Sequence, residues 1–494
     1  MKRERGEGKI QSTSSYWYSQ RHISAVLDLR FSASHLPSPL SACSGKLVNN
    51  YTNPIAPPRK AALVFIFITV LIDILAFGLI IPVLPHLIQT FLEGNVSQAA
   101  IWYGWFSTAY MTMQFFFTPV QGALSDWLGR RPVILASNLG LGLDFILMAT
   151  VNTLPLLFIG RIISGITAAS FSTANAYVAD VTPPEKRAQA FGMIGMAFGI
   201  GFVVAPAIGG FLGEINVRLP FWAAVVMCLT NFVYGLFVLP ESLPKERRTT
   251  HFDWAHANPF GALKLLRRYP QVLGLIGVLF LMALAHMIYP TTFVLYADYR
   301  FGWGPQMVGY TLAGVGVLAA IVQGVLIKKI VGGLGERRAL LFGLACGTAG
   351  FALYGLAPNG YWFWTVMPIA ALWGVAGPAA QAIMTHHVDP REQGRLQGAV
   401  ASLSAIAGII APTLFTRTFA AVTQANMHDA WAGITFGLAA LMVGGGLVLA
   451  WYTVSHLPPA VTIATQPPAA IVTSEILAGT ADLEPPFNES ETRA

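Results

Sequence analysis

Residues 122–132 read GALSDWLGRRP and connect two long apolar runs, at about 99–121 and 133–152. This short stretch holds one acid, two arginines, two glycines and a proline. Glycine permits a sharp turn, and proline suits the first turn of a helix, where its missing N–H costs nothing. The stretch therefore predicts a tight connection between two helices, and it carries charges that a plain connection does not need.

The composition of the whole chain predicts a membrane protein. The 494 residues are 54% hydrophobic and 11% charged, with a mean hydropathy of +0.58, whereas a soluble domain carries about a quarter charged residues. Apolar runs of about twenty residues, enough to cross a hydrocarbon core of about 30 Å, recur between Ala61 and Trp451. The runs lack the period-two alternation of a membrane barrel, so we predict an all-α polytopic membrane protein.

We expect twelve transmembrane helices. Their approximate ranges are 61–91, 99–121, 133–152, 154–179, 190–212, 220–239, 272–297, 307–330, 339–357, 361–385, 397–421 and 430–454.

The distribution of basic residues predicts the orientation. With the N-terminus inside, sixteen Lys and Arg residues fall in inside loops, against Arg218, Arg300 and Arg417 outside. This bias follows the positive-inside rule and places both termini in the cytoplasm. The net charge of +7 therefore reports topology and not nucleic-acid binding, and three scattered cysteines indicate neither a disulfide framework nor a metal site.

An internal repeat predicts two halves. At one offset of 206 residues, Gly192 matches Gly398, Pro206 matches Pro412, and Gly129 matches Gly335. We expect two six-helix halves, at 61–239 and 272–454, joined by a central cytoplasmic loop at 240–271. Parallel halves of this kind are a transporter architecture with the substrate site between them.

The two ends of the chain differ in composition from the apolar body. Residues 1–60 are basic and rich in Ser and contain no span, which fits a disordered tail, an organelle-targeting leader or a start codon placed too far upstream. Residues 455–494, rich in Pro, Ala, Thr and Glu, predict a disordered cytoplasmic tail.

These motifs resemble the major facilitator superfamily, and within it the drug:proton antiporters of the bacterial tetracycline-efflux group. The likeness rests on GALSDWLGRRP, on DILAFGLIIPVLP at 73–85, on YVADVTPPEKRAQAFG at 177–192 and on GERRAL at 335–340. The resemblance implies a bacterial inner-membrane exporter of a small molecule, driven by protons through alternating access. It implies no cofactor beyond the proton gradient, no nucleic-acid partner, and a monomer that works alone in the lipid bilayer.

The resemblance implies a cytoplasmic gate that holds that face closed and breaks when the halves rock. Its expected residues are Gly122, Asp126, Gly129, Arg130, Arg131 and Asp180. We expect both arginines to reach Asp180 from the next helix end. The alternative is a purely topogenic loop, since arginines alone satisfy the orientation rule.

Three charges fall well inside the apolar spans: Asp73, Asp144 and Arg161. A charge at the bilayer centre costs at least about 2.5–3.5 kcal/mol, so such residues usually pair or face a cavity. Burial disfavours a charged carboxylate and a nearby arginine favours it, so a site with both can bind and release a proton. We predict that the two acids form the proton and cation site, tuned by Arg161; a structural ion pair is the alternative.

Other polar residues inside the spans are expected either to line the pathway or to form interhelical hydrogen bonds. These candidates are Gln114, Asn175, His286, Gln323 and Gln381. The stretch GFVVAPAIGG at 201–210 resembles an antiporter signature, with Ala205 in place of a glycine, and it contributes Gly201, Pro206, Gly209 and Gly210. Ordinary small-residue packing of helices is the alternative for this stretch.

The resemblance fails in the second half of the chain. Where tetracycline exporters carry a third membrane acid the sequence reads Ala345-Cys346-Gly347, and LMALAHMIYP at 281–290 lacks the glutamines of the family. Tetracycline and any magnesium chelate are therefore doubtful cargo, and a cationic or amphipathic drug is an equal candidate. A facilitator or importer of an endogenous solute is the alternative function, and a non-transporting receptor is a more remote one.

Two further classes are disfavoured by missing motifs. The sequence has no Gly-x-x-x-x-Gly-Lys-Ser/Thr stretch for an ATP-driven pump. It also has no paired metal ligands or nucleophile elbow for a membrane enzyme, so we predict neither catalysis nor a metal site.

Overall fold

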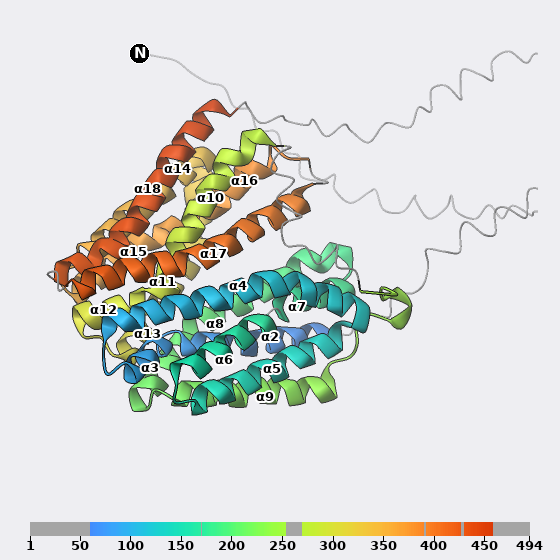
Figure 1. Ribbon diagram of the computed structural model, residues 1–494. Coiled ribbons are helices and arrows are strands. Elements are labelled where there is room, and N and C mark those ends of the chain that lie inside the picture. The colour runs from blue at the N-terminus through green and yellow to red at the C-terminus, as the bar shows by residue number, and fades with distance from the viewer. Residues whose placement is uncertain (1–59, 169, 253–268, 390–391, 426–428, 458–494) are drawn as a thin grey trace, which may run out of the picture. The chain divides into compact units, whose positions relative to one another are not determined.

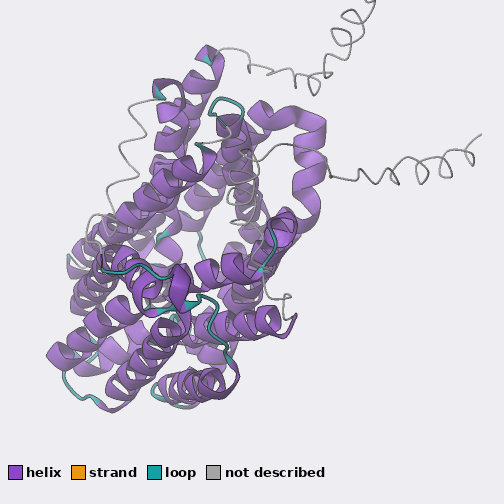
Figure 2. Ribbon diagram, turned by 90° about the vertical axis from the view of Figure 1, so that its right-hand side faces the viewer, coloured by secondary structure: helices purple, strands orange, loops and turns teal. Residues whose placement is uncertain are grey.

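The computed structural model describes residues 60–168, 170–252, 269–389, 392–425 and 429–457, which form helices and short connections with no strand among them (Figure 2). The predicted tails at 1–60 and 455–494 lie almost entirely outside the described residues. The same holds for residues 253–268 of the predicted central loop at 240–271.

Eight α-helices make up the part that we call the N-terminal half. They are α2 (Lys60–Ile80), α3 (Leu84–Phe91), α4 (Val96–Leu128), α5 (Arg130–Thr150), α6 (Leu154–Thr167), α7 (Ser170–Val181), α8 (Arg187–Ile215) and α9 (Leu219–Val238).

The described part of the C-terminal half contains nine α-helices and several short 3-10 or π-helical segments, of which η5 and η6 are used below. The α-helices and these two segments are α10 (Leu273–His286), α11 (Ile288–Thr291), α12 (Phe293–Phe301), α13 (Pro305–Ile321), the π-helical η5 (Val322–Leu326), α14 (Ile327–Gly355), α15 (Gly360–Ala371), the 3-10 segment η6 (Leu372–Val375), α16 (Ala376–Thr385), α17 (Gln393–Gln424) and α18 (Ile434–His456).

Local chemistry explains where several helices begin and end. The side chain of Asn95 accepts a hydrogen bond from the backbone N–H of Gln98 and caps α4, and Asn359 caps α15 in the same way. Gly302 ends α12 in the left-handed region, with φ of 64°. Gly129, with φ of 107°, makes the sharp turn from α4 to α5 that residues 122–132 predict.

Ten helical stretches of the described chain are long and apolar enough to cross a membrane. One of them, Pro305–Gly355, has 51 residues, which at 1.5 Å per residue extends about 75 Å, more than twice the hydrocarbon core. Its backbone leaves the helical region at Gly335, where φ is 76°. If this stretch is divided at Gly335 into two spans, and the 33-residue α4 is added as a further span, the number of transmembrane helices becomes twelve. The number twelve stays a prediction.

Backbone features recur at the offset of the sequence repeat. Gly129 and Gly335 both have positive φ, and Pro206 and Pro412 both lie inside long helices, α8 and α17. A positive φ favours glycine over any residue with a Cβ atom. The matched glycines therefore meet the same backbone demand in both halves.

The two halves meet along two helix pairs. α4 lies beside α17, and α8 packs against α13 (Figure 1). In the second pair, a Cβ atom added to Gly309 would lie 3.1 Å from the Cα atom of Gly210 and would contact the carbonyl oxygen of Pro206. Glycine at both positions therefore permits this close approach of α8 and α13.

Hydrogen bonds between the halves gather toward the end of the helices at Asn95, opposite the end at Gly129. Tyr103 donates to the carbonyl oxygen of Pro290 over 2.5 Å, and Gln89 donates to Asp298 over 3.1 Å. The hydroxyl of Ser97 donates to the carbonyl oxygen of Ala420 over 3.0 Å. We refer below to these two ends as the Asn95 end and the Gly129 end.

Candidate functional site

Asp73 lies on α2 and is 6% exposed. The side-chain amide of Asn231, on α9, donates to its Oδ1 atom over 3.0 Å. Asn138, on α5, lies with its amide nitrogen 3.3 Å from both carboxylate oxygens when that amide is oriented to donate. Three helices thus hold this membrane carboxylate through neutral donors.

Asp144 lies on α5 and is 1% exposed. Its Oδ2 atom accepts a hydrogen bond from Ser164 on α6. Its Oδ1 atom is buried and has no hydrogen-bond partner among the described residues. A Cβ atom at Gly160 would lie 3.0 Å from this oxygen, so α6 approaches the acid closely there. One oxygen of the carboxylate is therefore free to carry a proton.

Arg161, on α6, is 5% exposed, and its guanidinium carbon lies 4.5 Å from the centre of the Tyr110 ring. Such a cation–π contact compensates part of the cost of burying a charge. No carboxylate oxygen of a described residue lies within 4.0 Å of its nitrogens. Arg161 lies on the same helix as Ser164, the hydrogen-bond partner of Asp144. Whether these charges form a proton site or a structural ion pair stays a prediction.

A cavity of about 360 Å³ in the N-terminal half brings these charges together. Asp73, Arg161 and Ser164 line it, and Asp144 lies behind Ser164. Gln114 lines the same cavity, as predicted for a pathway residue. Most of the remaining wall is apolar, so water inside it is scarce and the charges interact strongly.

A second cavity, of about 460 Å³, lies in the C-terminal half. It is lined by His286, Gln323 and Gln381, three of the polar residues that the sequence singles out. Asn175 differs from them, because it lies exposed on α7 and lines neither cavity. The position of Asn175 follows from the rotation of α7, which the sequence pattern does not determine.

The opening stretch forms a charged cluster around Arg130 at the Gly129 end. The Arg130 guanidinium contacts Asp126 at 2.6 Å and Asp180 at 3.0 Å, and it donates to the Ser125 hydroxyl over 2.6 Å. The backbone N–H of Arg130 donates to Glu241 over 2.9 Å. Ser125, Asp126 and Asp180 belong to the N-terminal half, and Glu241 lies in the connection that follows α9.

Arg131 behaves differently from its neighbour, and the expectation that both arginines reach Asp180 is not met. Arg131 donates to the carbonyl oxygen of Leu236 over 2.6 Å. Successive residues on an α-helix point about 100° apart, so only one of two adjacent arginines can face Asp180. Gly122 has open space around it and no close neighbour that requires a glycine.

The glycines of α8 lie at tight contacts. A Cβ atom at Gly201 would contact Ile74, and one at Gly209 would contact the carbonyl oxygen of Leu79, both on α2. A Cβ atom at Gly210 would contact Pro305 of the C-terminal half. The glycines of this stretch therefore serve packing within the N-terminal half and between the halves, while Pro206 lies inside the helix.

Several residues of the site were not predicted from the sequence. Asn138, which lies within reach of Asp73, is one of them. Glu241, in the LPES segment after α9, binds the backbone of Arg130 and forms an ion pair with Arg248 at 3.3 Å. The feature of the sequence that could have indicated Glu241 is its position as a carboxylate next to a basic loop. Asp298 and its hydrogen-bond partner Gln89 lie near the ends of membrane spans. Polar residues are common there, so the sequence does not mark these two as site residues.

An all-helical membrane chain, with two cavities in two halves that pack along paired helices, defines a membrane transporter rather than an enzyme. The chain belongs to the Major Facilitator Superfamily, whose family model matches residues 66–412.

Relatives and solved structures agree with this assignment. The chain is 37% identical to a tetracycline resistance protein, class C, of Escherichia coli, over 75% of this chain and 92% of the relative. It is 27% identical to multidrug resistance protein 2 of Bacillus subtilis (strain 168), over 80% and 96%. The crystal structure of a human organic anion transporter covers 80% of this chain and 100% of its own, with a TM-score of 0.58 and 23% identity.

Proposed function

We propose that this protein is a proton-coupled antiporter that exports a drug, either tetracycline-like or another amphipathic or cationic compound, by alternating access. The observation that carries the proposal is the pair of buried membrane carboxylates, Asp73 and Asp144, beside the cation Arg161 at one cavity. The drug-resistance names of the relatives support the same class of cargo.

The chemistry of the two acids suits proton exchange. Burial favours the protonated form of a carboxylate, and a cation or water that reaches the carboxylate favours its charged form. Asp73 faces the cavity and Asp144 contacts its wall through Ser164. A cationic drug entering the cavity would favour the charged form and release the proton, which is the exchange that an antiporter needs.

We also infer the setting of this transport. The protein lies in a bacterial inner membrane with both termini in the cytoplasm, works as a monomer, and needs no cofactor besides the proton gradient. Hydrogen bonds between the halves gather at the Asn95 end, which supports an arrangement that faces the cytoplasm at the Gly129 end. The described residues contain no group of three or more His, Cys, Asp or Glu that could hold a metal, and a magnesium-chelated substrate remains a doubtful cargo.

The test uses inside-out vesicles energised to an acidic interior, with a pH-sensitive dye. Tetracycline and unrelated cationic drugs are added in turn to the wild type, Asp73→Asn, Asp144→Asn and Glu93→Gln. Glu93 is an exposed carboxylate in the connection after α3, so its variant controls for loss of one negative charge. We expect proton release in the wild type and in Glu93→Gln, and none in the two membrane variants.

Two results would contradict the proposal. Folded wild-type protein that answers no drug would favour the facilitator or importer of an endogenous solute. Proton release that persists in both Asp73→Asn and Asp144→Asn would show that the membrane carboxylates do not carry the proton.

A further inference from the structure

Three of the interruptions of helical geometry in the C-terminal half border the 460 Å³ cavity. α10 ends at His286, the π-helical η5 contains Gln323, and the 3-10 segment η6 contains Trp373. These three residues line the cavity. Irregular backbone at membrane depth is tolerated where it lines a cavity or is buried in protein, and π-helical turns are frequent at functional sites.

The wall of this cavity is mostly apolar, includes the rings of Tyr289, Tyr354 and Trp373, and carries no acid, lysine or arginine among its lining residues. The ring of His286 lies 5.8 Å from that of Trp373 and 5.9 Å from that of Tyr289, measured between centroids. The cavity of the N-terminal half contrasts with it, because Asp73 and Arg161 line that one. Both cavities have aromatic rings in their walls, and they differ in charge, because only the cavity of the N-terminal half is lined by an acid and an arginine.

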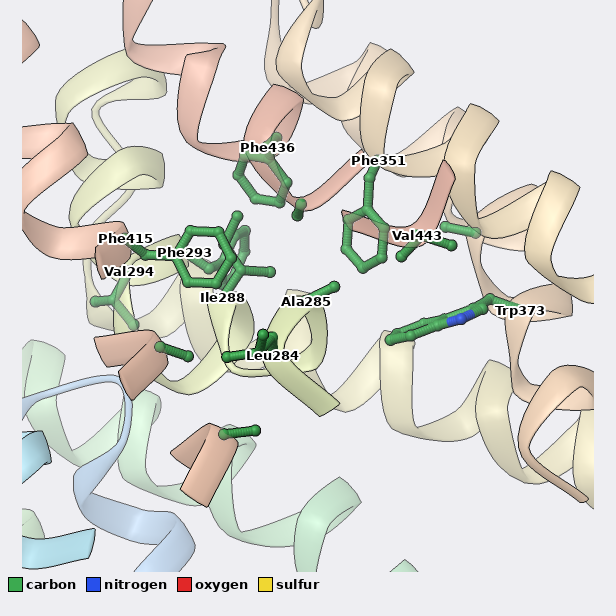
Figure 3. Close-up of a cluster of buried hydrophobic side chains, with 14 of the residues drawn as sticks. Leu284, Ala285, Ile288, Phe293, Val294, Phe351, Trp373, Phe415, Phe436 and Val443 are labelled. Atoms are coloured by element: carbon green, nitrogen blue, oxygen red, sulfur yellow. The ribbon is translucent and has the colours of Figure 1, made fainter. Parts of the chain in front are cut away.

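A second row of buried rings holds the aromatic wall in place. Phe351 lies 5.1 Å from Trp373 and 5.9 Å from Tyr289, and Figure 3 shows Phe351 and Trp373 at one side of the buried cluster that includes Phe436. A Cβ atom at Gly347 would lie 2.7 Å from Trp373. The absence of a side chain at Gly347 therefore leaves room for the ring of Trp373.

The cavity is also lined by three polar side chains that have no hydrogen-bond partner among the described residues. His286, Gln323 and Gln381 are exposed and make no hydrogen bond to any other described residue. A glutamine amide can donate and accept at once. These side chains are therefore available to carbonyl and hydroxyl groups of a ligand.

We propose that this cavity binds the uncharged, planar fused-ring part of the transported drug, with His286, Tyr289 and Trp373 as ring contacts and with Gln323 and Gln381 as hydrogen-bonding partners. The inference deepens the proposed function and rests on it. A volume of 460 Å³ lies within the range of about 300–1,000 Å³ that small-molecule sites occupy. The preset rings lower the entropy cost of binding.

The test measures equilibrium binding to purified full-length protein and proton release in reconstituted vesicles. Tetracycline is the fused-ring probe, ethidium is a second planar probe, and tetraethylammonium is a cation without rings. The variants are Trp373→Leu and Gln323→Ala, with Trp451→Leu as the matched control. Trp451 lies on α18 and is 62% exposed, so its loss removes a tryptophan without touching the cavity.

We expect Trp373→Leu to weaken the binding of tetracycline and ethidium about tenfold, as loss of one ring contact implies. Gln323→Ala weakens tetracycline binding several-fold. Trp451→Leu, outside the cavity, keeps the wild-type affinity for tetracycline and ethidium. Gln323 is exposed and lacks hydrogen-bond partners among the described residues, so its variant keeps the test valid if Trp373→Leu fails to fold.

Unchanged tetracycline binding in folded Gln323→Ala and Trp373→Leu would overturn the inference, as would a wild type that binds neither planar probe. A wild type that binds tetracycline through these residues but releases no proton would instead contradict the proposed antiport and leave the binding site standing. The two failures are therefore distinguishable.

Discussion

Replacing Arg130 or Arg131 with alanine separates a structural cluster from a topogenic loop. Both variants remove one positive charge from the same connection, so their effect on membrane orientation is equal. Their contacts differ, because Arg130 contacts Asp126, Asp180 and Ser125. The only side-chain hydrogen bond shown for Arg131 in the described structure goes to the carbonyl oxygen of Leu236.

The expected free-energy losses follow from these contacts. Removing one partner of a buried ion pair costs about 3–5 kcal/mol. Water reaches the carboxylates left behind, since the side chains of Asp126 and Asp180 are 48% and 24% exposed, and we therefore expect about 2 kcal/mol for Arg130→Ala. Arg131→Ala loses one hydrogen bond, worth about 1 kcal/mol.

Denaturant unfolding of the purified protein in detergent measures this difference, with drug-dependent proton release as the functional readout. We expect Arg130→Ala to lose more stability than Arg131→Ala, and Arg130→Lys to recover part of the loss because it keeps the charge but not the forked geometry. Equal losses in the two alanine variants would refute the cluster and leave the loop a topogenic signal.

Three further substitutions test the packing and the polar contacts of the site. Gly210→Ala places a methyl group against Pro305 and Gly309 and is expected to cost about 1–3 kcal/mol in thermal or denaturant unfolding, whereas Gly437→Ala, with open space around it, is expected to be tolerated; similar losses would contradict the packing argument. Asn231→Ala removes a hydrogen bond to Asp73, and a double-mutant cycle with Asp73→Asn is expected to give a coupling of about 1 kcal/mol, which a value of zero would disprove. Asn95→Ala removes the cap of α4 and lowers stability by about 1 kcal/mol, and an unchanged unfolding midpoint would show that the cap contributes nothing.

The sequence predicts the membrane charges well because a rare residue type is easy to recognise. Asp73, Asp144 and Arg161 stand out inside apolar spans, and the structure places all three in or behind one cavity wall. The turn at Gly129 is also predictable, because a glycine between two helical runs usually marks a sharp turn of the backbone.

Partners across helices are not predictable from the sequence, because they depend on how each helix is rotated. Asn138 reaches Asp73 from α5, yet an asparagine in a span is as often a packing residue. The aromatic cavity depends on η5 and η6, where the helix departs from regular geometry. Periodicity assumes 3.6 residues per turn and therefore misplaces the residues that such segments carry.

The contacts between the halves at the Asn95 end are weak enough for proton movement to break them. Hydrogen bonds from Gln89, Ser97, Tyr103 and the backbone of Gln306 cross that end, each worth about 1 kcal/mol net. His86 also lies 3.9 Å from Asp298 there, and the glycine contacts of α8 and α13 add packing. Opening that end therefore costs a few kcal/mol. One charge moving through 100 mV supplies about 2.3 kcal/mol, so on the proposed antiport one or two protons at Asp73 and Asp144 would provide the energy to open the face toward which the drug is released.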